Sequence, residues 1–370
     1  MSVDAVLLVI DGLGVTNPGL LALLDLLVKS FLILLLCFCI VALLRTHSPS
    51  SRSTVWIVGM SSLLFLPLLQ SQVPQLQLAF ALTSGLLADS ATTEWLGRLA
   101  GNLELLLLAY FAIASLLLAY FLLGLWQVLR IAHRSQPIED TRLTHLLQRL
   151  KYSNGVSADV ALLVSDELHS PITLGIFRHK IIFPVTALSW KEELQQQALS
   201  HELGHIFRND WLQQLAVRIV QCLYWLNPLV WVASERFHLS SEMACDDIAV
   251  DDAGSNLDYA ENLLWLATAS SKQILHGRAL LSGESMLSRR IHYILDDTAN
   301  HATIDRNGCI PGFAVALTVS ALIASFGVTV IEEEIAAVPV VTIPVQYFSN
   351  GSLESQLFAS ELEQHKFERK

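Results

Sequence analysis

The chain has 370 residues, of which 53% are hydrophobic and only 15% are charged, and its formal net charge is −11. Soluble globular proteins carry about 25% charged residues, so this composition indicates a membrane protein. The negative balance argues against a nucleic-acid-binding role for the whole chain, because such proteins present positive charge to phosphates. The five cysteines do not form a disulfide framework, and we expect all of them to be structural.

Four apolar stretches are predicted to cross the membrane, on the basis of their length and hydropathy. They are Leu26–Leu44, Thr54–Leu69, Leu103–Leu129 and Ile310–Ile331. Lys29 lies near one end of the first stretch, where we expect its ammonium group to reach the membrane interface. The first residues contain acids and no basic region, so no cleavable signal peptide is expected and the first stretch is interpreted as a retained anchor.

Basic residues in the short loops predict the orientation of these spans. Residues 45–53 contain Arg45 and Arg52 without an acid, whereas residues 70–102 contain two acids and a single arginine. The N-terminus is therefore predicted to lie outside and the segment between the third and fourth spans to lie in the cytoplasm. The predicted organisation is residues 1–130 with three spans, residues 131–309 as a cytoplasmic domain, residues 310–331 as the fourth span and residues 332–370 as a short extracytoplasmic tail.

The first part of the cytoplasmic domain is predicted to contain a small sheet. Asp159–Ser165, Ile172–Phe177 and Lys180–Pro184 are short β-branched runs separated by turn residues, with a hairpin turn expected at Arg178-His179. An edge strand of such a sheet has the geometry to hold an extended peptide by strand addition. A sheet that serves only for packing fits these residues equally well.

A helix is predicted next, because Ser189 and Glu192 form a capping box, and it is expected to run to Phe207. Residues 201–205 within it read His-Glu-Leu-Gly-His. An HExxH sequence on a helix places two imidazoles about one turn apart on one face, as a zinc ion requires, with a glutamate beside the bound water. About one or two per cent of chains of this length contain the motif by chance, so it needs support from the rest of the sequence.

The following segment, Trp211–Ala233, is apolar but carries several polar residues and an Asn-Pro pair. It is predicted to be an amphipathic helix against the membrane rather than a fifth span. A crossing here would also place every later residue on the opposite side from the two histidines. Asp210, just before this segment, is interpreted either as a carboxylate that orients a histidine or as a helix-end charge.

A catalytic zinc ion uses three protein ligands and keeps a fourth position for water, so His201 and His205 need a partner. Glu242 is the predicted third ligand, and Glu235, one heptad earlier, is the alternative. Asp246 lies four residues beyond Glu242 on the same helical face. It is placed there to accept the second ring N–H of a ligand histidine.

Five segments together resemble a known family. The chain contains, in this order, SPITLGIF, IIFP, HELGHIFRND, NPLVW and SEMACDD. At these spacings they resemble the membrane metallopeptidases of the BlaR/MecR antirepressor type, over roughly residues 20–331. The resemblance implies an α-helical integral protein of the bacterial inner membrane, with about four spans and a cytoplasmic α+β zincin-like metallopeptidase domain.

The resemblance also implies the chemistry and the partners. By that resemblance, His201, His205 and Glu242 are expected to bind Zn²⁺. Glu202 is expected to be the catalytic base that activates water for peptide hydrolysis. The substrate would be the chain itself or a cytoplasmic regulator such as a winged-helix transcriptional repressor, and the second partner would be the lipid bilayer. Whether the chain works as a homodimer is left open. A second oxyanion donor is expected, for which the sequence does not rank Tyr224, Arg236, His238 and Tyr259.

The chain departs from the β-lactam receptors of that family, which carry a penicillin-binding domain with a Ser-x-x-Lys motif after the fourth span. Residues 332–370 contain no such motif, so direct β-lactam sensing is not expected. Two other functions combine HExxH with membrane spans. One is a quality-control protease similar to the CAAX and heat-shock membrane proteases; the other is a non-catalytic, zinc-stabilised receptor or scaffold. Glu202 argues against the scaffold, because a purely structural zinc site needs no base.

Overall fold

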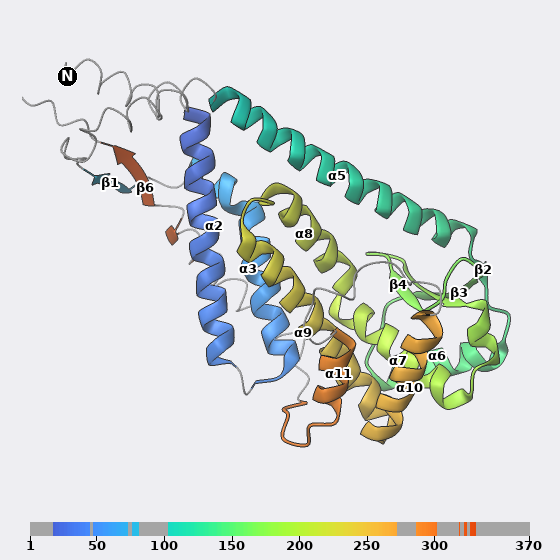
Figure 1. The fold of residues 1–370 in the computed structure, drawn as a ribbon. Helices are drawn as coiled ribbons and strands as arrows, with labels where there is room; N and C mark the ends of the chain where they lie inside the picture. The colour runs from blue at the N-terminus through green and yellow to red at the C-terminus, as the bar shows by residue number, and fades with distance from the viewer. Residues whose placement is uncertain are drawn as a thin grey trace, which may run out of the picture.

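The computed structural model describes residues 18–44, 47–72, 76–80, 103–271, 286–301, 318, 322–323 and 326–330 of the chain. Three long helices, α2, α3 and α5, extend from a group of shorter helices and a four-stranded sheet (Figure 1). Helices α8 and α9 lie against the long helices, and helix α7 connects them to the sheet. This arrangement brings the predicted metal ligands to one end of the long helices.

The three long helices are those whose length and hydropathy are sufficient to cross a membrane in the described part of the chain. Helix α2 spans Pro18–Leu43, α3 spans Pro49–Gln72 and α5 spans Leu103–Arg134. The first three predicted spans are thus confirmed as apolar helices, although α3 begins earlier and α5 ends later than predicted.

The fourth predicted span, residues 310–331, falls mostly outside the described residues. Its described end, Phe326–Val330, is a strand (β6) that pairs in parallel with strand β1, Leu76–Phe80. The tail at residues 332–370 lies entirely outside the described residues.

Lys29 is buried in α2, and its Nζ atom lies 2.6 Å from Oδ2 of Asp25 with only 4% of its side chain exposed. The ammonium group is therefore paired within the protein, and its expected position at the membrane interface stays a prediction. An acid one helical turn earlier offsets this charge within α2 itself.

The sheet contains β2 (Gln136–Pro137), β3 (Val160–Ser165), β5 (His179–Pro184) and β4 (Ile172–Leu174), in that spatial order. Strands β3 and β5 are parallel, and β4 pairs with β5 in an antiparallel hairpin. The three predicted strands are present, but the hairpin bends at Gly175, where φ is 107° and a Cβ would meet the Arg178 carbonyl oxygen at 2.1 Å. Only glycine fits this position.

The helices of the domain follow in chain order. They are α6 (Thr141–Ser153), the short 3₁₀ helix η3 (Val185–Ser189), α7 (Glu192–Arg208), α8 (Asp210–Leu223), α9 (Pro228–Ala253), α10 (Asn256–Ser271) and α11 (Met286–Ile294). Leucines of α6 and α7 pack on Ile181 and Phe183 of β5 and form the core beside the sheet. This core fixes one face of α7 and leaves its histidine face turned toward α9.

The capping box predicted at Ser189 is wrong. Ser189 closes η3 instead, and its Oγ donates a hydrogen bond of 2.8 Å to the Thr186 carbonyl. Helix α7 begins at Glu192, where Glu192 and Glu193 place negative charge at the positive end of the helix dipole. A short serine side chain forms such local bonds readily, and this one replaced the cap.

The single helix predicted over Trp211–Ala233 is also wrong, because the chain forms two helices there. Helix α8 ends at Leu223, and α9 starts after Asn227, whose Oδ1 accepts a 3.0 Å hydrogen bond from the Leu229 amide. Pro228 occupies the first helical turn, where its missing N–H costs nothing. An Asn-Pro pair is thus a helix start rather than an interruption.

Helices α8 and α9 share one hydrophobic core with the first two apolar helices. Leu34 of α2, Trp56 and Leu63 of α3, Val220 of α8 and Phe237 of α9 all belong to it. The segment that carries the site is therefore packed directly onto the membrane helices (Figure 1).

Candidate metal centre

Helices α7 and α9 approach closely at Gly204. A Cβ at this position would lie 3.3 Å from both Cβ and Sγ of Cys245 and from Cδ1 of Ile248. The glycine therefore permits a helix contact that a larger side chain would widen. This contact holds the histidines of α7 opposite Glu242 of α9.

His201, His205 and Glu242 form a cluster whose potential ligand atoms all lie within 4.8 Å of one another. Nε2 of His201 lies 3.6 Å from Oε2 of Glu242, and Nε2 of His205 lies 3.6 Å from Oε1 of the same carboxylate. Two imidazoles and one carboxylate are a donor set that suits a divalent transition metal. We call these three residues the metal cluster.

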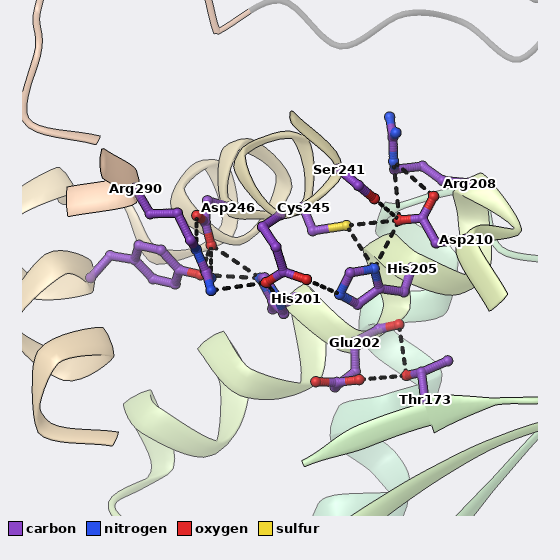
Figure 2. A network of polar contacts seen from close by, with 12 residues as sticks. Thr173, His201, Glu202, His205, Arg208, Asp210, Ser241, Cys245, Asp246 and Arg290 are labelled. Atoms are coloured by element: carbon purple, nitrogen blue, oxygen red, sulfur yellow. Dashed lines mark hydrogen bonds and ion pairs between the residues drawn. The ribbon is translucent and has the colours of Figure 1, made fainter. Parts of the chain in front are cut away.

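Each histidine turns its other ring nitrogen toward a buried carboxylate. Nδ1 of His201 lies 3.2 Å from Oδ1 of Asp246, and Nδ1 of His205 lies 2.8 Å from Oδ2 of Asp210 (Figure 2). A carboxylate at Nδ1 fixes the tautomer that leaves the Nε2 lone pair free for a metal. The structure thus brings both predicted carboxylates to the cluster, and Asp210 is also the first residue of α8.

Asp246 is held by residues from two further helices. Arg290 of α11 donates to both of its oxygens, at 2.8 Å and 2.6 Å, and Tyr259 of α10 donates to Oδ1 at 2.7 Å. Arg290 also lies 2.8 Å from Oε2 of Glu242. One guanidinium therefore connects a ligand carboxylate of the metal cluster with the carboxylate that orients His201.

Asp210 has different partners. Ser241 of α9 donates to its Oδ2 at 2.6 Å, and Nε of Arg208 lies 3.4 Å from the carboxylate. The same arginine donates to Oγ of Ser50 at 2.8 Å and to Oγ of Ser53 at 2.6 Å, both in the first turns of α3. The carboxylate that orients His205 is therefore tied to a membrane helix.

The charges of the centre shift its titrating groups strongly. Burial opposes charge on His201, but its contacts with Asp246 and Glu242 outweigh burial and raise its pKa to about 10. Asp210 and Glu242 likewise raise the pKa of His205 against the effect of burial. Burial also opposes ionisation of Glu242, yet the two histidines and Arg290 hold its pKa well below the usual range. The site thus favours positive charge between the rings, which a metal cation provides in place of ring protons.

Glu202 lies on the cavity side of α7 and is held by the sheet. Oγ1 of Thr173, on the edge strand β4, lies 2.6 Å from its Oε2 and 3.2 Å from its carbonyl oxygen. Both residues line a cavity of about 410 Å³ together with the metal cluster. A carboxylate that lies beside the metal cluster and faces this cavity is suited to accepting and returning a proton.

The other predicted residues differ in whether they lie near the metal cluster and line the cavity. Glu235, the alternative ligand, is exposed on α9 and lies outside the metal cluster. Of the four oxyanion candidates, Tyr259 alone lines the cavity, and its hydroxyl is bonded to Asp246. Sequence reasoning missed Thr173, Arg208, Ser241 and Arg290. Thr173, Arg208 and Ser241 lie in the segments SPITLGIF, HELGHIFRND and SEMACDD, whereas Arg290 lies outside all five segments.

The chain is 29% identical to the regulatory protein BlaR1 of Bacillus licheniformis over 191 residues. The aligned segment covers 50% of this chain and 32% of that protein. The match thus spans about a third of the relative's length. The BlaR1 peptidase M56 family matches residues 21–294, which include most of α2, the whole of α3 and α5, and the metal cluster. The chain therefore belongs to the BlaR1 peptidase M56 family of membrane-associated metallopeptidases.

Proposed function

We propose that the protein is an integral-membrane zinc endopeptidase that takes part in signalling. The observation that carries this proposal is the paired support of the histidines, whose Nε2 atoms face Glu242 while Asp246 and Asp210 hold their Nδ1 atoms. Zinc is the metal that this donor set fits best, because three protein ligands leave a fourth position for water or substrate. When bound, it would polarise the scissile carbonyl and make water a stronger acid.

The residues of the chain supply the remaining steps. Glu202 accepts a proton from the attacking water and returns it to the nitrogen of the leaving amine. Thr173 holds the Oε2 atom of Glu202 from the sheet, so the base keeps its position while the proton moves. Asp246 and Asp210 keep the imidazole rings oriented throughout.

The substrate is a protein segment in extended form. In the part of the chain that the structure describes, β4 pairs with β5 on one side only, and Ser170–Thr173 line the cavity beside the metal cluster. An extended peptide added to that edge would pass its backbone in front of Glu202. We propose the chain itself or a cytoplasmic winged-helix repressor as substrate, with the catalytic domain in the cytoplasm. Membership of the M56 family favours this signalling role over membrane quality control.

Matched glutamate variants test the proposal. The full-length protein in detergent is expected to bind one zinc ion, which His201→Ala removes. Glu202→Gln is expected to keep the zinc and to lose cleavage of the chain itself and of a casein probe, both read by mass spectrometry. Glu235→Gln makes the same chemical change at an exposed position of α9 and should leave cleavage intact. A parent without stoichiometric zinc, or a Glu202→Gln variant that cleaves at the parental rate, would overturn the assignment.

A further inference from the structure

The connection between α8 and α9 reaches deep among the apolar helices. Residues Asp210–Leu223 run away from the metal cluster, the chain turns at residues 224–227, and α9 returns to place Glu242 opposite the histidines. In Figure 1 this hairpin lies beside α2 and α3 and beneath α5. We refer to residues 210–242 as the α8–α9 hairpin.

A proline in α3 explains one contact at the tip of the hairpin. The carbonyl of Leu63 would normally accept the amide of the residue four positions later, but that residue is Pro67, which has no N–H. The hydroxyl of Tyr224 donates to this carbonyl at 2.8 Å and replaces the missing partner. Within a bilayer such a group must be satisfied by protein, since no water is available.

Two more hydrogen bonds join the tip to the other apolar helices. Nδ2 of Asn227 donates to Oγ of Ser30 in α2 at 2.9 Å, and this contact is buried. The hydroxyl of Tyr110 in α5 donates to the carbonyl of Leu223 at the end of α8. The tip is thus hydrogen-bonded to a side chain of α2, a backbone carbonyl of α3 and a side chain of α5.

The three contact points lie at similar depth. Ser30 is eight residues from the span end at Ala22, Leu63 is six from Leu69, and Tyr110 is six from Glu104. At 1.5 Å per residue these distances are about 9–12 Å from the ends remote from the metal cluster. Since the hydrocarbon core is about 30 Å thick, the tip lies within it and past its middle.

The outer surface of the tip is apolar. Leu223, Leu226 and Trp231 are exposed, as are the leucines of α5 along the neighbouring span. The charged group on α8 nearest the tip, Arg218, donates to Oε1 of Gln221 at 3.0 Å, so one of its N–H groups is satisfied on the helix itself. The exposed apolar surface of the hairpin therefore continues the surface that the spans present to lipid.

We propose that the α8–α9 hairpin is a re-entrant membrane element, which enters the bilayer from the side that carries the metal cluster and whose tip is covered by lipid acyl chains. The proposal rests on the membrane placement of α2, α3 and α5 and not on peptidase activity. Its consequence is functional, because the first residue of α8 is Asp210 and α9 carries Glu242. Insertion of the hairpin fixes the metal cluster at the membrane surface, where it acts on segments close to the bilayer.

Spin labels on the full chain in lipid nanodiscs test this placement. In a background without the five native cysteines, a nitroxide is placed at Leu226, with labels at Leu122 on α5 and Leu257 on α10 as lipid and water controls. The three side chains are similarly exposed, at 52%, 51% and 59%. The ratio of accessibility to oxygen over a water-soluble nickel chelate is expected to be high at Leu226, as at Leu122.

A Leu226 label with the low ratio found at Leu257 would overturn the re-entrant placement. If the Leu226 variant aggregates, a label at Trp231 in the first turn of α9 decides by the same criterion. The measurement needs no turnover. A chain that binds no zinc but shows a lipid-exposed Leu226 would therefore remove the peptidase proposal and leave the membrane element standing.

Discussion

His201 and His205 occupy one helical face four residues apart, yet different parts of the molecule hold them. Asp246, Arg290 and Tyr259 support His201; Asp246 lies on α9 beyond residue 242, and the other two lie on α11 and α10. Asp210 and Arg208 support His205, and the arginine continues to Ser50 and Ser53 of the membrane helix α3. The position of His201 is thus fixed by contacts within the domain, whereas the position of His205 depends on the position of α3. Changes on the two sides should therefore have different consequences.

The largest effect is expected on the domain side. Arg290→Met leaves the buried Asp246 and the partly exposed Glu242 without their shared cation, and breaking a buried ion pair on one side costs about 3–5 kcal/mol. The free energy of unfolding of the metal-free protein should fall by that amount in a denaturant titration in detergent micelles. Arg289→Met, at the neighbouring position of α11, is the control. Equal free energies of unfolding for the two variants would show that the ion pairs of Arg290 do not stabilise the domain.

A pH dependence is expected from Asp247, which lies next to Asp246 and faces Tyr293 and His301. Burial raises its pKa from 3.8 to about 6, against the bonds from His301 and Tyr293. A folded-state pKa above the unfolded value means that the protonated form stabilises the fold below about pH 4, and that this contribution is lost as the pH rises through 6. Two pKa units correspond to a loss of about 3 kcal/mol.

Asp247→Asn removes this titration. Relative to the parent, the variant should gain stability between pH 4 and pH 6 and show a constant difference above pH 7. Unfolding titrations at several pH values, with a chelator present in every sample, measure the difference without a contribution from metal release. A difference that does not change with pH would contradict the buried, protonated state of this carboxyl group.

On the membrane side, Arg208→Gln is expected to lower zinc affinity about tenfold, the range typical for residues that orient a ligand indirectly. The double change Ser50→Ala and Ser53→Ala keeps the arginine beside Asp210 but releases it from α3, so its effect should have the same sign and be smaller. Competition with a chromophoric chelator measures both affinities. The cobalt-substituted spectrum should shift in the same variants, because it reports ligand geometry.

Ser62→Ala is the matched control, since Ser62 is also a buried serine of α3 but donates to Gly59 within its own helix. If the double serine variant binds zinc with the same affinity as Ser62→Ala, the contact of Arg208 with α3 does not influence zinc binding at His205. Agreement between Arg208→Gln and the double variant would instead place the whole effect in the contact with the membrane helix.

The two sides also differ in how far they could be predicted from sequence. Helical spacing predicts that Glu242 and Asp246 share a face and that His201 and His205 point the same way, and hydropathy predicts the first three spans. Arg290 acts across 44 residues on Asp246, Thr173 across 29 on Glu202 and Arg208 across 155 on Ser53. Such contacts depend on tertiary packing, which no local period encodes. The turn at residues 224–227 differs, because it has a local signal. Asn227-Pro228 is a typical helix start, but the apolar content of the segment predicts one continuous helix.

The smallest effect is expected at the tip of the hairpin. Tyr224→Phe removes the hydroxyl that satisfies the Leu63 carbonyl, and hydrogen bonds between membrane helices contribute about 0.6 kcal/mol on average and up to about 1.7 kcal/mol. Tyr120→Phe, on the exposed face of α5, is the control. Because Pro67 leaves this carbonyl without an amide in its own helix, Pro67→Ala should restore one and make Tyr224→Phe nearly neutral in the double variant. Unfolding in lipid-containing micelles measures the parent and the four variants. Losses that simply add would show that the tyrosine does not compensate for the proline.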